Sequence, residues 1–93
     1  MQKEIKMPYI KQQDRKNYDE LVKELISQLV RREDMPGRLN YCISSIVFKL
    51  FEDNPCYSNA NNLMGALSCV QQEFYRRKVA LLEDKKINEN GDI

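Results

Sequence analysis

Three stretches of the chain repeat their apolar residues with the spacing of an amphipathic α-helix. They predict helices at about 14–33, 38–52 and 58–83, separated by the breaks Met35-Pro36-Gly37 and Asp53-Asn54-Pro55. Residues suited to cap a helix start stand ahead of these segments: Asp14 or Asn17, Asp34 or Gly37, and Ser58 or Asn59.

No pair of strands is credible and the loops between the segments are short, so the fold expected is all-α. Residues 14–84 would form one three-helix unit with a long C-terminal helix. Residues 1–13 would be an extended arm, which Pro8 favours, and 85–93 a polar tail. Either Met1 or Met7 fits a natural start.

The third segment has two apolar stripes when it is placed on a helix at 100° per residue. A chain of 93 residues buries only about 60–65% of its unfolded surface, so covering both stripes calls for a partner. We therefore expect a homo-oligomeric helical bundle. The first stripe holds Leu63, Leu67, Val70, Phe74 and Leu81, and the second holds Met64, Tyr75, Val79 and Leu82. The expected subunit contacts are the residues of the second stripe together with Phe48 of the second segment.

A further apolar face on the second segment carries Tyr41 and Phe48, seven residues apart. Two readings remain open for it: a wider face buried within the chain, or a contact between subunits.

The composition argues against several classes of protein. There is no histidine, and the three cysteines include no CxxC pair, so we expect neither a metal site nor a secreted disulfide framework. No apolar run is long enough for a membrane span. The 15 basic and 14 acidic residues give no basic excess, so nucleic-acid binding is not favoured. No cofactor motif is present, and a reducing, cytoplasmic setting fits.

The sequence contains few of the residues and motifs that catalysis commonly uses. The general base most common near neutral pH is missing, and no nucleophile motif or phosphate-binding glycine loop is present. Glu73 precedes Arg76 and Arg77 by three and four residues, the spacing of a helix-surface salt bridge. We therefore expect a protein that is not an enzyme.

The best binding candidates are Tyr75, Arg76, Arg77 and Lys78. Arg77 continues the spacing of the first stripe, where an arginine either meets an acid across an interface, binds an anion, or simply lies along the edge of a core. Further candidates are Tyr41 as a stacking surface, and Asn61 and Asn62 as amide donors that capping alone would also explain.

The runs MPYI (7–10), DRKNYDEL (14–21), LNY (39–41), SNANNLMGALSCVQQEFYRR (58–77) and KINENGD (86–92) resemble a small family of phage, prophage and bacterial proteins. That family has no assigned function. The resemblance implies a phage-associated protein in the bacterial cytoplasm.

The third segment is also similar to the long helix of phage anti-CBASS and anti-Thoeris sponges, small helical oligomers that sequester cyclic nucleotide signals. Their pattern L-x-x-A-x-x-x-L-Q-x-x-F is matched loosely by Leu63, Ala66, Val70, Gln71 and Phe74, whereas Asn62 stands where they have an aromatic residue. This similarity implies a non-catalytic oligomer that binds a cyclic nucleotide. The alternative is a protein-protein interaction module that inhibits a host protein through its spare apolar helix face.

Overall fold

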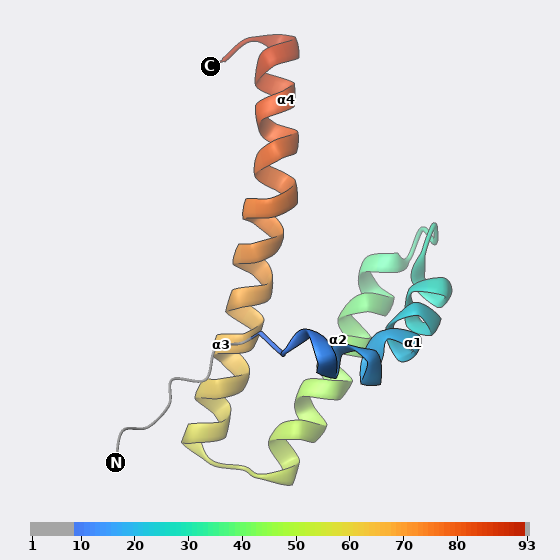
Figure 1. The fold of residues 1–93 in the computed structure, drawn as a ribbon, viewed down its shortest axis with the longest axis vertical. Coiled ribbons are helices and arrows are strands. Elements are labelled where there is room, and N and C mark those ends of the chain that lie inside the picture. Colours follow the sequence, from blue (N-terminus) through green and yellow to red (C-terminus); the bar gives the residue numbers. More distant parts are fainter. Residues whose placement is uncertain (1–8, 93) are drawn as a thin grey trace. The chain divides into compact units, whose positions relative to one another are not determined.

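The computed structural model describes residues 9–92, and every regular element in that range is helical (Figure 1). The all-α prediction is therefore confirmed. Most of the predicted N-terminal arm lies outside the described residues. The chain divides into unit 1, residues 1–56, and unit 2, residues 57–93, which are described separately.

Unit 1 is a pair of helices, α1 (Gln12–Leu29) and α2 (Met35–Asp53). The first helix ends four residues before the predicted position because Arg31 adopts a left-handed conformation, with φ of 64°. Two donors satisfy two of the carbonyl groups at the helix end: the Val30 backbone N–H bonds Ile26 O at 2.9 Å, and Arg32 Nε bonds Gln28 O at 2.7 Å.

The second helix begins at Met35, three residues before the predicted start, so Pro36 and Gly37 belong to its first turn. The prediction that they separate the two helices is wrong in this respect. Proline is compatible with a first helical turn, where its missing N–H would have no helical acceptor. Asp34 occupies the cap position, but its carboxylate accepts a bond from Arg38 Nε at 2.8 Å instead of capping the backbone.

Unit 2 is one continuous helix made of α3 (Tyr57–Phe74), a π-helical turn η1 (Tyr75–Val79) and α4 (Ala80–Asn90), as Figure 1 shows. At 1.5 Å per residue it is about 51 Å long. It starts before Ser58 and Asn59, so the prediction that one of these residues caps it is wrong.

The helix also continues seven residues beyond the predicted end at Glu83, into the expected tail. No proline or glycine interrupts the sequence until Gly91, and Lys86 and Glu89 form an i,i+3 ion pair in the last turns. Gly91 ends the helix with φ of 85°, and its N–H bonds Ile87 O at 2.7 Å.

No side chain of residues 9–92 is buried, so neither unit builds a hydrophobic core of its own. Two paired helices share only one line of contact, and a single helix has no internal partner. Large apolar side chains therefore stay exposed along both units, among them Phe48 in α2 and Met64 in α3. Burying them requires surface from outside each unit.

Candidate functional site

The π-helical turn η1 is the one irregularity inside the helix of unit 2. The backbone N–H of Ala80 donates to the carbonyl oxygen of Tyr75, five residues earlier instead of four. Phe74 and Val79 keep right-handed helical dihedral angles, so the helix accommodates an extra residue without breaking. Turns of this kind frequently occur at functional sites.

The extra residue changes which side chains share a face. Each residue of an α-helix advances by about 100°, so every side chain after the turn stands about 100° from the position that uniform counting gives it. Leu82 takes the angular position predicted for Leu81, in line with the stripe of α3. Beyond η1, Leu82 therefore joins the first stripe and Leu81 leaves it.

A hydrogen bond between Tyr75 and Glu83 reflects this rotation. The phenol O–H of Tyr75 donates to Glu83 Oε2 at 3.1 Å across eight residues. In a regular helix residues seven apart share a face, and an inserted residue brings the eighth residue there instead. The hydrogen bond to Glu83, followed by its negative charge, raises the pKa of Tyr75 above its ordinary value of 10.0.

Two arginines of η1 converge on a single carboxylate oxygen. Arg76 Nη2 and Arg77 Nε each lie 2.9 Å from Glu73 Oε2. The predicted helix-surface salt bridge is thus present, and it involves both arginines. The Glu73 side chain is 27% exposed, whereas those of Arg76 and Arg77 are 67% and 65% exposed. Their remaining donors therefore face solvent.

An open hollow of about 540 Å³ lies beside the turn on the helix surface, lined by Gln71, Gln72, Phe74, Tyr75 and Val79. It offers two aromatic rings and two side-chain amides. Residues 73 and 75 differ by about 200° around the helix, so the hollow and the Glu73 pair occupy different sides. All the lining residues come from one helix, so closing the hollow requires a second surface.

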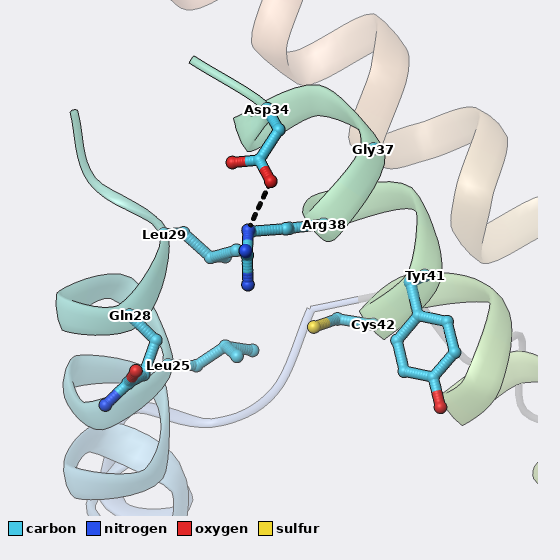
Figure 2. Close-up of a pocket in the computed structure, with 8 residues that line it drawn as sticks. All are labelled: Leu25, Gln28, Leu29, Asp34, Gly37, Arg38, Tyr41 and Cys42. Atoms are coloured by element: carbon cyan, nitrogen blue, oxygen red, sulfur yellow. Dashed lines mark hydrogen bonds and ion pairs between the residues drawn. The ribbon is translucent and has the colours of Figure 1, made fainter. Parts of the chain in front are cut away.

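Unit 1 has a hollow of its own, an open cavity of about 410 Å³ between α1 and α2 (Figure 2). Leu25 and Leu29 point into it from α1, and the thiol of Cys42 points into it from α2. Arg38 lies across it, held by Asp34, while the ring of Tyr41 stands at the edge, directed away from α1. The i,i+4 spacing of Asp34 and Arg38 was the sequence signal for this pair.

The structure brings together only part of the predicted ligand site. Tyr75, Arg76, Arg77 and Lys78 lie on one turn, but Tyr41 belongs to unit 1. Asn61 and Asn62 occupy the second turn of α3 and cannot cap it, because the helix starts at Tyr57. About 21 Å of helix separates Asn62 from Arg76. Within unit 2, the two asparagines and the residues of η1 therefore form two separate candidate sites.

Most of the side chains predicted for subunit contacts are exposed. Met64 is 69%, Phe48 63%, Leu82 56% and Tyr75 50% exposed, whereas Val79 is half-buried. The contact prediction requires such exposure.

Within residues 9–92, no group of three or more cysteine and acidic side chains lies close enough to bind a metal ion. No helix in the same range combines the length and the apolar character needed to cross a membrane.

The model of a family described as a domain of unknown function, DUF6899, matches residues 7–93. No curated protein and no solved structure is similar to the chain.

Proposed function

The chain belongs to the DUF6899 family of unknown function, and we propose that it is a non-catalytic homo-oligomer that sequesters a small phosphorylated ligand. Because no function is known for the family, this role is inferred from the residues of the chain itself. The ligand class that fits the sequence resemblance is a cyclic nucleotide. The cations of η1 would bind its phosphate groups, and the ring of Tyr75 in the same turn would contact a base.

The observation that carries this proposal is the convergence of Arg76 and Arg77 on Glu73 Oε2. Both guanidinium groups are aimed at one point that already holds a carboxylate oxygen. A phosphate oxygen offers the same charge and the same hydrogen-bond acceptors, and guanidinium binds it with two parallel bonds. Both arginines remain about two-thirds exposed, so a ligand can reach them.

The exposed apolar surface supports the oligomer. Neither unit covers its own apolar side chains, and a chain of this size gains stability from assembly when it lacks a core. The hollow lined by Phe74 and Tyr75 is open on one side for the same reason. A neighbouring subunit would turn it into an enclosed pocket.

Isothermal titration calorimetry with a panel of cyclic di- and trinucleotides tests the proposal. We expect at least one of them to bind, and the double variant Arg76→Gln/Arg77→Gln to lose about 10–100-fold in affinity, because two charge-assisted hydrogen bonds are removed. No binding across the panel would refute the ligand class.

The matched control is Arg15→Gln/Lys16→Gln on α1. It removes the same amount of charge from an exposed helix surface in unit 1. Binding that falls equally in both double variants would show a general charge effect, which is not a site at η1.

A second function is favoured by α2. Tyr41 and Phe48 lie two helical turns apart and are 73% and 63% exposed, which is the pattern of a helix face that binds another protein. In this alternative the chain is a monomer that inhibits a host protein. A monomeric mass, together with a purified partner that binds the native chain but not Tyr41→Ser/Phe48→Ser, would favour it over the sponge.

A further inference from the structure

The stripe of α3 is symmetric along the helix. Leu63, Leu67, Val70 and Phe74 follow one another at intervals of four, three and four, which read the same in both directions. At 100° per residue they lie within about 60° of one another. Leu63 is half-buried and the other three are exposed. A second copy running antiparallel therefore matches the stripe, with Leu63 opposite Phe74 and Leu67 opposite Val70.

The distribution of charge favours this direction over a parallel one. Residues 57–72 contain no charged side chain, whereas Glu73, Arg76, Arg77 and Lys78 follow directly. A parallel pair would place each of these charges at the same level along the contact as its own counterpart, and like charges near one another repel. In the antiparallel pair the same charges face the uncharged residues 59–64, and the helix dipoles oppose each other.

The antiparallel register also determines what lies beside the arginines. When Leu63 is opposite Phe74, Asn62 is opposite Tyr75, within about 3 Å along the axis of both Glu73 and Arg77 of the second copy. Asn62 and Glu73 lie about 20° apart around the helix, because eleven residues separate them. A two-fold axis perpendicular to the helices places that flank of both copies on the same side of the pair.

We infer that a second copy of the chain packs antiparallel on the α3 stripe, and that Asn62 of each copy completes the Glu73–Arg77 site of the other. The inference builds on the proposed function: the site at η1 is half of a site, and its other half is the amide of a second subunit. The dimer has two equivalent sites, one at each end of the contact. Asn61, about 160° from Leu63, points away from the contact.

Cysteine crosslinking tests the direction of the pair. In a background of Cys42→Ser, Cys56→Ser and Cys69→Ser, two proteins are made, one with Leu63→Cys and one with Phe74→Cys. We expect the mixture to crosslink at least about tenfold more than either protein alone, because identical positions lie about 16 Å apart and a disulfide spans less than about 7 Å. Leu63→Cys that crosslinks to itself would overturn the antiparallel arrangement.

A second measurement avoids changing the contact. A spin label on Asp84→Cys in the same background should give a distance of about 47 Å between the two copies by pulsed electron paramagnetic resonance. A parallel pair would give less than about 25 Å. A mass of about 11 kDa in solution, equal to one chain, would overturn the inference entirely.

Asn61 serves as the control in a test of the role of Asn62. We expect Asn62→Ala to raise the dissociation constant of the dimer about 2–10-fold through loss of hydrogen bonds, and Asn61→Ala to leave it unchanged. Equal effects of the two variants would refute the placement of Asn62. These experiments need no ligand, so an antiparallel dimer that binds no cyclic nucleotide would refute only the proposed function.

Discussion

The two halves of the unit 2 helix differ in how they are stabilised. The half after η1 contains its own partners: Lys86 pairs with Glu89, and Glu83 accepts the hydrogen bond of Tyr75. The first sixteen residues of the helix, 57–72, contain no charged residue and thus no ion pair. A helix whose charged side chains pair with one another is suited to solvent, whereas an uncharged helix with an apolar stripe depends on packing. This difference supports our proposal in which α3 is the assembling half and α4 the solvated half.

The largest effect is expected from a substitution in the assembling half. Leu67→Asp places a charge in the centre of the α3 stripe, and we expect it to weaken dimerisation by more than about 100-fold, because an unpaired charge would be buried. Sedimentation equilibrium measures the change. Leu81→Asp is the matched control, since Leu81 is 64% exposed and η1 rotates it off the stripe. Dimer loss in both variants would remove the distinction between the halves.

The next prediction concerns the boundary between the halves. Glu73→Gln removes the carboxylate that occupies Arg76 and Arg77, so we expect phosphate ligands to bind about 3–10-fold more tightly. Calorimetry with the same cyclic nucleotide panel measures this change. A loss of binding would instead assign Glu73 a direct contact with the ligand.

A smaller effect is expected on the face opposite the stripe. Gly65 lies about 200° from Leu63, and a Cβ added to it meets no atom within 4 Å. Gly65→Ala should therefore raise the free energy of unfolding by about 0.5–1 kcal/mol through helix propensity alone. Urea denaturation at fixed protein concentration measures it. A weaker dimer in this variant would show that another helix packs against Gly65.

The smallest expected effect concerns the solvated half. The pKa of Tyr75 is raised, so its contribution to stability is complete below pH 10 and is lost as the pH rises through the higher folded value. Glu83→Gln should lower the pKa of Tyr75 toward 10.0, which titration of ring-labelled tyrosine by nuclear magnetic resonance measures. The control Glu89→Gln should not change it.

The sequence predicts the helices well, because their apolar spacing is regular and the breaks contain proline. It predicts their ends less well. Pro36 predicts a break between helices, although a first helical turn tolerates proline. Asn90 lies in a polar segment without breakers, so only the folded backbone shows that the helix continues.

Part of the site was also predictable. The i+3 and i+4 spacing of Arg76 and Arg77 from Glu73 is visible in the sequence, and the structure contains both pairs. The π turn was not predictable, because Tyr75–Val79 has no glycine, proline or other local signal. The hydrogen bond from Tyr75 to Glu83 depends on that turn and could not be anticipated either.

The π turn has a consequence for relatives of this chain. A helix that has absorbed an additional residue can lose one there without breaking, because the wide turn then closes to an ordinary α-turn. An alignment of homologous chains should therefore place a single-residue gap within 75–79 and nowhere else between 57 and 90. Chains with that gap would carry a straight apolar line in which the equivalent of Leu82 follows the equivalent of Phe74 by seven residues.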